Sequence, residues 1–368
     1  MRNIPYIDLK TQHKLLKDEL IEAFSQVLEN ADFILGEEVN LLESKIADYC
    51  GVKYAIGVNS GTDALFLSLK GCGIGPENEV ITVPNSFIAT VSSIVATGAK
   101  PVFVDVKKDM NIDPELVEKN ITKRTKAIIP VHLGGKPASM DQIIEIAQRY
   151  NLFVIEDAAQ AIGAEYKGKK VGSLGYAGCF SFHPLKTLNA CGDGGIITTN
   201  DEKLYKVLVQ LRNIGLKNRN EVEIWGYNSR LDTIQAAILL IKMKYLDVWI
   251  EKRRKIAKYY IKHLQGIVDL PTENSDIKSV YYTFVIRTDN RDKLQKYLEK
   301  HGVKTKIYYP IPIHLQKIVA KTFDYKKGDF PVCESLVEKI LSLPIHQGLS
   351  DNDLTYIVNR IQDFFGKR

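Results

Sequence analysis

The sequence predicts an α/β protein whose large domain holds a mostly parallel sheet and whose smaller C-terminal domain is α+β. Three observations lead to this prediction. Short β-rich runs alternate with helical patterns from Tyr54 to about Thr199, and the pattern turns helical after Asn200. The length of 368 residues also exceeds what one hydrophobic core usually serves. We therefore expect a large domain over residues 1–245 and a small domain over residues 246–368.

Seven short runs in the large domain have the apolar composition of buried strands. They are "YAIGV" (54–58), "EVITV" (79–83), "PVFVDV" (101–106), "KAIIPVHL" (126–133), "LFVIEDAA" (152–159), "GCFSF" (178–182) and "GGIITT" (194–199). Between several of them lie stretches such as "DALFLSLKGCG" and "MDQIIEIAQRY", whose apolar spacing suits one face of a helix. This alternation favours a mostly parallel sheet with helices on its faces.

The rest of the chain follows a different pattern. The amphipathic stretch "RLDTIQAAILLIKMKYLDVWIEKRRKIAKYYIKHL" (230–264) predicts one or two long helices that lead into the small domain. That domain combines the strand-like "YYTFVIRT" (281–288), the helical "RDKLQKYLEKHG" (291–302) and a closing helix near "DLTYIVNRIQDFF" (353–365). No Gly/Ser linker separates the parts, so we expect the two domains to be joined directly.

Composition and charge indicate an ordinary folded protein. Apolar residues make up 45% of the chain and charged residues 26%, which argues against disorder. The formal net charge of +6 is spread along the chain, and its densest run, Lys252–Lys255, falls in an expected helix. We interpret this run as a solvated face, with steering of an anionic substrate as the alternative. No nucleic-acid partner is expected.

The cysteines and the N-terminal residues predict that the protein is located in the cytoplasm. The five cysteines are odd in number and lack a C-x-x-C pair or a nearby histidine cluster, which predicts free thiols in a reducing cytoplasm and no metal site. They are Cys50, Cys72, Cys179, Cys191 and Cys333. The N-terminal "MRNIPYIDLK" reaches polar residues too early for a signal peptide, and no run of about 20 uncharged apolar residues follows. We therefore expect a cytoplasmic protein without a membrane partner.

Polar side chains follow the ends of three predicted strands. Ser60 is a plausible helix N-cap in "NSGTDALF", with Asp63 three residues later. Asp157 closes "LFVIED", and Lys186 comes just after "CFSF" as the only ammonium group in residues 179–195. Ligands of such sheets gather beyond the carboxyl ends of the strands, so these residues are predicted to share a site.

The surroundings of Lys186 match those of a lysine that forms a Schiff base with pyridoxal phosphate. The pyridine nitrogen needs a buried carboxylate, for which Asp157 is the candidate, with helix capping as its alternative role. The phosphate needs N–H donors at a helix N-terminus, which the turn Ser60–Thr62 can supply, although a simple helix cap would look similar. The ring needs an apolar face, and Phe87 in "PNSFIAT" is the candidate, with core packing as the alternative. If Lys186 were only a solvent-exposed lysine in a turn, these three features would not be expected in the same sequence.

Long motifs over nearly the whole chain also carry a family likeness. They include "NSGTDAL", "VIEDAAQAIGAEYKGKKVGSLG", "CFSFHPLKTLNACGDGGIITTND", "GYNSRLDTIQAAIL" and "YYPIPIHLQ". Together they resemble the DegT/DnrJ/EryC1/StrS family of sugar aminotransferases. The resemblance implies the type I fold of pyridoxal-phosphate-dependent transferases, which is aspartate aminotransferase-like, and a homodimer with active sites at the subunit interface. It implies transfer of the amino group of L-glutamate to a keto-sugar nucleotide, with pyridoxamine phosphate as the intermediate form of the cofactor. Such a reaction would serve deoxyamino sugar biosynthesis for lipopolysaccharide, another surface polysaccharide or a glycosylated metabolite.

The resemblance also assigns roles to residues. Lys186 would hold the cofactor covalently and move the proton, and Asp157 would pair with the pyridine nitrogen. The other cofactor contacts would be Gln160 beside the phenolic oxygen, Phe87 on the ring, Gly61, Thr62 and Ser181 at the phosphate, and Asn228 at the phosphate of the partner subunit.

Two departures from the family pattern fall near the substrate. The family often shows Tyr-Pro-Gly-Lys-Asn-Leu-Gly-Ala around its lysine, where this chain has "HPLKTLNA", and Ile214 stands where many members have His or Tyr. These changes leave the cofactor assignment intact and the identity of the sugar open. The candidate substrate contacts are His183, Tyr309 and His314, and a structural role is an equal alternative for His183.

Three other functions are alternatives to this one. A sugar dehydratase of the same family has histidine at the lysine position, so Lys186 argues against it. A regulatory member without catalysis is opposed by the intact Lys186, Asp157 and Gln160. An aminotransferase acting on a keto-cyclitol stays open.

Overall fold

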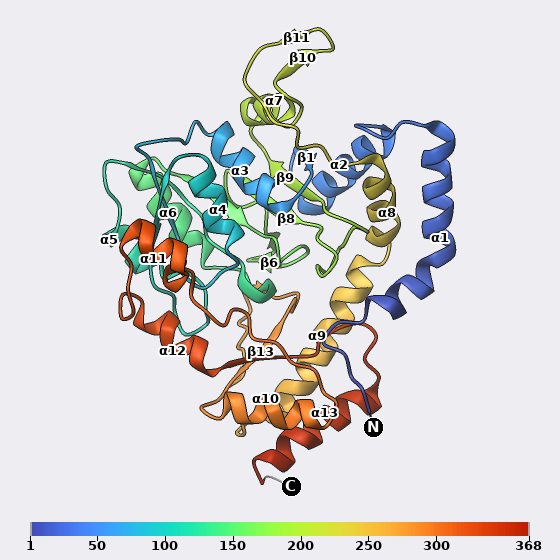
Figure 1. Cartoon of the computed structure of the whole chain (residues 1–368), viewed down its shortest axis with the longest axis vertical. Helices are drawn as coiled ribbons and strands as arrows, with labels where there is room; N and C mark the ends of the chain where they lie inside the picture. Colours follow the sequence, from blue (N-terminus) through green and yellow to red (C-terminus); the bar gives the residue numbers. More distant parts are fainter. Residues whose placement is uncertain (1, 367–368) are drawn as a thin grey trace.

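A seven-stranded sheet forms the centre of the large domain in the computed structural model, which describes residues 2–366 (Figure 1). The strand order is β1-β9-β8-β5-β4-β2-β3, and all strands run parallel except β9, which is antiparallel to β1 and β8. The strands are β1 (Tyr54–Val58), β2 (Glu79–Thr82), β3 (Lys100–Phe103), β4 (Thr125–Ile128), β5 (Phe153–Asp157), β8 (Ala177–Ser181) and β9 (Gly195–Thr199). All seven predicted runs contribute a strand, so the predicted mostly parallel α/β fold is confirmed.

Helices cover both faces of this sheet. Successive strand residues point to opposite faces, and both sets of side chains are apolar and buried. In β9, Ile197 packs in a buried cluster with Leu65 and Leu208, whereas Ile196 packs with Leu42 and Leu239 on the other face. The helices of the large domain are α2 (Glu37–Cys50), α3 (Gly61–Gly71), α4 (Ala89–Ala96), α5 (Pro114–Lys119), α6 (Met140–Tyr150), α7 (Glu202–Leu211) and α8 (Thr233–Met243). The long helix α1 (Leu9–Asn30) packs along α8 at one edge of the molecule (Figure 1).

The small domain is α+β. The strands β13 (Phe284–Arg287) and β14 (Ile340–Leu343) pair antiparallel beside α9 (Leu246–Leu264), α10 (Arg291–Lys300) and α13 (Asp351–Phe364). The predicted stretch 230–264 is two helices, α8 and α9, which separate at Lys244–Tyr245. Ile4 packs in the core of the small domain, whereas Ile313 and Phe330 pack against the large domain near α6. The domain boundary at residues 245/246 stays a prediction, because a residue near the N-terminus packs in the small domain and residues of the C-terminal region pack against the large domain.

Shorter elements connect the domains. The strand β12 (Ile277–Lys278) pairs with the hairpin β6 (Glu165–Tyr166) and β7 (Lys169–Lys170), and α11 (Lys317–Phe323) and α12 (Pro331–Lys339) lie beside the large domain. A second hairpin, β10 (Leu216–Asn218) and β11 (Glu221–Val222), stands away from the body of the molecule (Figure 1). Trp225, just after this hairpin, is 95% exposed.

The basic run Lys252–Lys255 was expected to be a solvated face, and this expectation is wrong for its two arginines. Arg253 is buried, and its Nη1 donates to backbone oxygens of Tyr281, Tyr282 and Ile345. Arg254 pairs with Glu273 at 2.8 Å. Because α9 packs one of its sides into the core of the small domain, part of the run faces inward and only the two lysines are exposed.

Two further expectations concern absences. The five cysteines are free, and residues 2–366 contain no group of three or more His, Cys, Asp or Glu side chains arranged to hold a metal ion. None of the helices in this part of the chain combines the length and the apolar character needed to cross a bilayer.

Candidate active site

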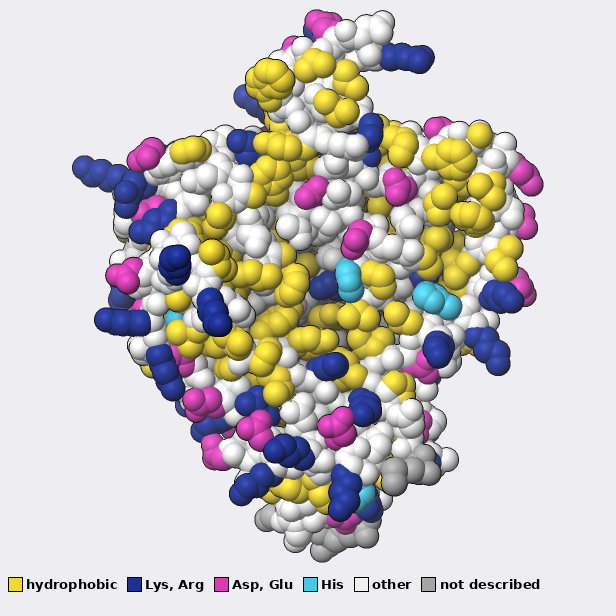
Figure 2. All heavy atoms as spheres, in the orientation of Figure 1, with side chains coloured by type: hydrophobic (Ala, Val, Ile, Leu, Met, Phe, Trp, Pro, Cys, Tyr) yellow, Lys and Arg dark blue, Asp and Glu magenta, His cyan; other side chains and the backbone are white. Residues whose placement is uncertain are grey.

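A cavity of about 230 Å³ opens at the carboxyl edge of the parallel strands, with tyrosines of the C-terminal region on its other side. Figure 2 shows the surface of this face, which is hollowed near its middle and lined there by apolar side chains. The lining includes the cofactor residues expected in the same chain, namely Gly61, Thr62, Phe87, Asp157, Gln160, Ser181 and Lys186. The structure thus brings together residues that are far apart in sequence, such as Gly61 and Lys186, which are separated by 125 positions.

Lys186 lies in the turn that follows β8. The turn is closed by a hydrogen bond from the Lys186 N–H to the His183 carbonyl at 2.8 Å. Burial lowers the pKa of the Lys186 side chain to about 8, while the charge of Asp157 opposes this shift. A substantial fraction of this amine is therefore neutral near neutral pH, and only a neutral amine can act as nucleophile or base.

Asp157 is a buried carboxylate that forms no ion pair with any of the described residues 2–366. Its Oδ2 accepts a hydrogen bond from Thr90 Oγ1 at 2.7 Å, and its Oδ1 accepts one from the Ala159 N–H at 3.2 Å. These are its only side-chain hydrogen bonds within the described part of the chain, and burial raises its pKa despite them. A carboxylate in this state favours a cationic ligand, so its surroundings fit the protonated pyridine nitrogen of pyridoxal phosphate.

A close approach of three backbone segments forms the opposite end of the cavity. Ser60 caps α3 by accepting from the Asp63 N–H, as predicted, and the first N–H groups of that helix have no intrahelical acceptor. A Cβ atom on Gly61 would lie 2.6 Å from the Cβ of Ser181, and one on Gly195 would lie 2.3 Å from the Ser60 carbonyl oxygen. Only glycine fits at these two positions, and the resulting cradle of N–H and hydroxyl groups fits a phosphate.

Gln160 and Phe87 also line the cavity. Gln160 Oε1 accepts from the Gly134 N–H at 2.7 Å, and its Nε2 donates to the Tyr309 hydroxyl at 3.2 Å, so both ends of the amide are held. Phe87 is 54% exposed, and its ring centre lies 5.8 Å from that of Tyr309. A half-exposed aromatic ring at a cavity wall is available to stack on a flat ligand.

Four polar lining residues were not predicted from the sequence: Thr90, Asp193, Tyr282 and Tyr308. Tyr282 lies directly beside the reactive lysine, with the Lys186 Nζ 4.9 Å from its ring centre. Thr90 lies in the first turn of α4, three residues after Phe87. A hydroxyl side chain this close in sequence to a predicted cofactor contact could have been predicted to line the same site. Tyr282 and Tyr308 come from the C-terminal region, and no local pattern links them to the sheet.

A buried hydrogen-bonded pair, Glu156 and His132, lies on the other face of β5 from Asp157. Glu156 points to the opposite face of β5, where His132 Nε2 lies 3.0 Å from its Oε2 and both side chains are fully buried. His132 Nδ1 accepts from the Ala138 N–H, so the ring proton must be on Nε2 and must be donated to Glu156. The carboxylate also accepts from the N–H groups of Gly172, Leu174 and Gly175.

The remaining predicted residues lie in different places. His183 lines the rim of the cavity, where its Nδ1 accepts from the Leu185 N–H at 3.3 Å, and Tyr309 lines the wall. His314 lies outside the cavity: it is fully buried, with its Nε2 2.9 Å from Glu334, so it has no face toward a substrate. Asn228 is exposed and is not part of the cavity lining of its own chain.

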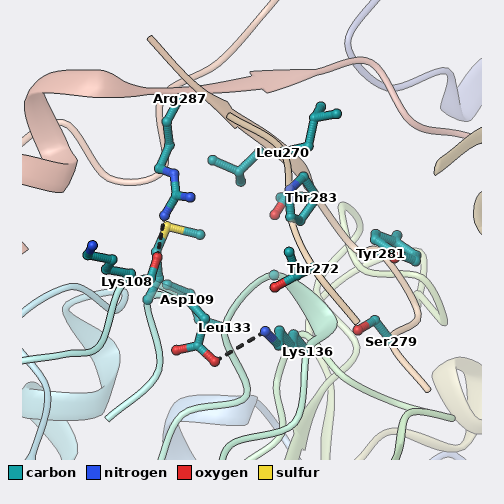
Figure 3. A pocket seen from close by; sticks show the side chains of 14 residues that line it. Lys108, Asp109, Leu133, Lys136, Leu270, Thr272, Ser279, Tyr281, Thr283 and Arg287 are labelled. Atoms are coloured by element: carbon teal, nitrogen blue, oxygen red, sulfur yellow. Dashed lines mark hydrogen bonds and ion pairs between the residues drawn. The ribbon is translucent and has the colours of Figure 1, made fainter. Parts of the chain in front are cut away.

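A second cavity, of about 170 Å³, lies between the large domain and the strand β13 (Figure 3). Three of its four charged side chains interact within the protein, since Lys136 pairs with Asp109 at 3.1 Å and Arg287 donates to the Lys108 carbonyl. It shares Gly134 with the wall that holds Gln160. The carboxylate in its described lining, Asp109, already has a cationic partner in Lys136, so we place the chemistry in the first cavity.

Comparison with known proteins gives a consistent result. The model of the DegT/DnrJ/EryC1/StrS aminotransferase family matches residues 14–362. The chain is 45% identical to a dTDP-3-amino-3,6-dideoxy-alpha-D-galactopyranose transaminase of Aneurinibacillus thermoaerophilus, over 98% of this chain and 99% of that one. It is also 45% identical, over 99% of both chains, to a pleiotropic regulatory protein of Geobacillus stearothermophilus. The crystal structure of Streptomyces venezuelae DesV in complex with a ketimine intermediate superposes with a TM-score of 0.97 at 40% identity, covering 99% of each chain.

Proposed function

The chain belongs to the DegT/DnrJ/EryC1/StrS aminotransferase family, and we propose that it transfers the amino group of L-glutamate to a keto-sugar nucleotide. Its cofactor is pyridoxal phosphate, and its acceptors are keto-sugar nucleotides. The observation that carries the proposal is the presence of Lys186 and Asp157 in one cavity at the carboxyl edge of the sheet. An amine of lowered pKa and a buried carboxylate without a paired cation are the two groups on which this chemistry depends.

The cofactor contacts that we propose are those that the family resemblance implies, and the shared lining of the cavity supports them. Lys186 would hold the cofactor covalently, and Asp157 would hold the proton on its pyridine nitrogen. Phe87 would cover the ring, and Gln160, whose amide is fixed at both ends, would lie beside the phenolic oxygen. The phosphate would be held by Gly61, Thr62 and Ser181. Bound there, pyridoxal phosphate supplies an electron sink that makes a C–H bond next to nitrogen acidic.

The protein's own groups then manage one proton. Lys186 is a buried amine whose pKa in the cofactor-free chain is about 8, which suits it to accept a proton and return it near that pH. Asp157 stays ionised when it faces a cation, because the paired charge offsets the effect of burial. Tyr282 and Tyr309 form the wall on the other side and limit access of water to the amine.

The charges of the cavity support a shared active site. Among the lining residues of the described chain, Lys186 is the only lysine or arginine, whereas Asp157 and Asp193 are acidic. A cofactor phosphate, two glutamate carboxylates and a nucleotide diphosphate bring several negative charges to this place. One chain alone offers little to balance them, so we propose that a second copy completes the site.

Exposed apolar side chains indicate which surface a second copy covers. On α1, Leu15, Ile21, Phe24 and Leu28 are exposed, and so are Ile214, Val222 and Trp225 around the hairpin β10–β11. Asn228 lies at the base of this hairpin region, bridged to Asn213. In a symmetric dimer the same loop reaches both sites, and Asn228 would then contact the phosphate bound by the partner.

The amino donor and the compartment are also proposals. Glutamate is the donor implied by the resemblance, and its two carboxylates suit a site completed by a second chain. All five cysteines are free in the structure, which is what a reducing cytoplasm maintains.

An acceptor panel tests the proposed function. The purified protein is incubated with L-glutamate and with dTDP- and UDP-linked keto-sugars that carry the keto group at C3 or C4, and 2-oxoglutarate and the aminated product are measured. A keto-cyclitol is included because that alternative is open. We expect 2-oxoglutarate to form only with a keto-sugar nucleotide. Turnover of the cyclitol alone would contradict the substrate class, and absence of any turnover would favour a regulatory role, as the name of one relative suggests.

A further inference from the structure

A second lysine lies buried beside the turn that carries Lys186. Lys242, in the last turn of α8, has a relative exposure of 0%, and a buried ammonium group is costly unless it is fully hydrogen-bonded. Its Nζ donates to the backbone oxygen of Asn189 at 2.9 Å and to Asn189 Oδ1 at 2.6 Å, and it lies 3.1 Å from His13 Nε2. These three acceptors match the three hydrogens of the ammonium group. Burial, together with the charge of Lys242, lowers the pKa of His13, which keeps its ring neutral and able to accept.

Asn189 links this ammonium group to Lys186. Its Nδ2 donates to the backbone oxygen of Lys186 at 3.0 Å and lies 3.3 Å from Gln12 Oε1. Because Oδ1 accepts from Lys242, the NH₂ end of the amide must face Lys186. The residue is only 2% exposed, so water does not compete for these bonds. A continuous path of hydrogen bonds therefore runs from α8 through Asn189 to the lysine turn.

The helix α8 holds the same turn at a second point. Gln235 Oε1 accepts from the Cys191 N–H at 2.9 Å. Gln235 and Lys242 are seven residues apart, so they lie on one face of α8. The lysine turn is thus fixed to the helix by two side chains, in addition to the backbone bond from Ala190 to Phe182 at 2.7 Å.

We propose that Lys242 and Asn189 are positioning residues for Lys186, and that they hold the turn after β8 so that the Lys186 amine points into the cavity. The inference rests on the proposed function in one respect, namely that Lys186 is the cofactor lysine. The family motif given above does not imply this tether, since Asn189 stands where that motif has glycine. A glycine there could donate no side-chain hydrogen bond to the Lys186 carbonyl.

The test measures how fast cofactor-free protein captures pyridoxal phosphate at Lys186. Lys242→Met removes the ammonium group at nearly constant length, and Asn189→Gly removes the link while the rest of the site stays. Lys244→Met is the matched control, because Lys244 lies two residues further on and pairs with Glu19 at the surface. Samples taken at intervals are reduced with borohydride, and the labelled peptide is identified by mass spectrometry. We expect both test variants to label Lys186 roughly tenfold more slowly or worse, as expected for loss of a hydrogen bond to a charged group, and the control to match wild type.

The pH dependence of the capture rate separates positioning from general destabilisation. The neutral amine is the nucleophile, so the midpoint of the rate profile reports the pKa of Lys186. A loosened turn exposes the amine to water and moves this midpoint upward, toward the ordinary value for lysine. A variant that is merely less stable has fewer folded molecules but an unchanged midpoint. We expect an upward shift in Lys242→Met and Asn189→Gly and none in Lys244→Met.

Each result has a defined meaning. If Lys242→Met does not fold, Asn189→Gly decides, because it keeps the bond from Lys242 to the backbone of residue 189. Wild-type rates and midpoints in folded Asn189→Gly would overturn the proposal. If the wild-type protein itself were not labelled at Lys186, the cofactor assignment would fail instead, so the two failures can be told apart.

Discussion

The ammonium nitrogen of Lys186 lies 4.9 Å from the centre of the Tyr282 ring. The backbone of Tyr282 is held by buried Arg253, whose Nη1 donates to the Tyr282 carbonyl at 3.3 Å and to the Ile345 carbonyl at 2.6 Å. The reactive lysine of the large domain therefore meets an aromatic face supplied by the C-terminal region. This contact makes the properties of the amine depend on how the two regions are joined.

Replacing Tyr282 changes the pKa of Lys186. A cation above an aromatic face is stabilised by about 0.5–2 kcal/mol, so Tyr282→Leu should lower the pKa of Lys186 below its value of about 8. The measurement is the pH profile of pyridoxal phosphate capture by the cofactor-free protein. Tyr282→Phe keeps the ring and is the control, with an expected midpoint near wild type. Equal midpoints in the Leu and Phe variants would show that the ring face has no electrostatic role.

Replacing Asp157 affects activity and stability in opposite directions. With cofactor bound, Asp157→Asn no longer stabilises a protonated ring nitrogen, and kcat should fall on the order of 10²-fold or more. Without cofactor, the wild-type carboxylate is buried and its pKa is raised. A carboxyl group whose pKa is higher in the folded than in the unfolded protein stabilises the fold only while it is protonated. This contribution is therefore lost as the pH rises from about 4, the pKa in the unfolded protein, through the pKa in the folded protein.

The melting temperature of the cofactor-free protein checks the second effect. Asp157→Asn should melt above wild type, and the difference should grow as pH rises through that range. The control is Asp193→Asn, which removes an exposed carboxylate lining the same cavity. A pH-independent difference would mean that Asp157 has a cationic partner in the free protein.

The buried pair behind Asp157 is expected to contribute strongly to folding. Glu156 accepts hydrogen bonds from three backbone N–H groups and from His132. Glu156→Gln places an NH₂ group against one of these donors, and we expect a loss of about 3 kcal/mol in the free energy of unfolding. Urea denaturation measures it. Glu118→Gln is the matched surface variant, since Glu118 pairs with Arg149 in solvent, and it should lose less than about 1 kcal/mol. Similar losses in both variants would contradict the role assigned to Glu156.

Mixing two inactive variants tests whether the active site is shared. Lys186→Ala lacks the reactive amine, and Asn228→Ala should be strongly impaired because it lacks the phosphate contact supplied to the partner. In a mixed dimer, one site carries both changes and the other carries neither. Each mixed dimer should therefore have about one half of the activity of a wild-type dimer. Subunit exchange is verified with differently tagged chains. Proven exchange without recovery would mean that Asn228 serves its own chain or no site.

The parts of the structure that follow from local pattern could be predicted, and those that depend on distant packing could not. The seven strands were found because apolar runs of strand length alternate with helical spacing, and Ser60 was found because an N-cap has a local signature. The break between α8 and α9 was not located, since the apolar pattern continues through Lys244–Tyr245. Arg253 was placed at the surface because its partners, the carbonyls of Tyr282 and Ile345, lie 29 and 92 residues away.

The candidate site shows the same division. Asp157 and Lys186 follow strand ends, and the topology alone brings such residues to one edge of the sheet. His314 was chosen because its segment lies near the site, but the spacing of a segment does not say which way a side chain points, and this one faces Glu334. Lys242 gave no signal, because a lysine in an amphipathic helix is normally solvent-exposed, and only the packing of α8 against α1 and Asn189 buries it.

The most direct test of the central claim is to find the lysine that holds the cofactor. The purified protein is reduced with borohydride in the presence of pyridoxal phosphate, digested, and mapped by mass spectrometry, with Lys186→Ala as the control. We predict that the label lies on the peptide containing Lys186, that the yellow colour disappears on reduction, and that the variant is neither coloured nor labelled. A label on any other lysine, or an equally labelled Lys186→Ala protein, would contradict the assignment of Lys186 and the active site built around it.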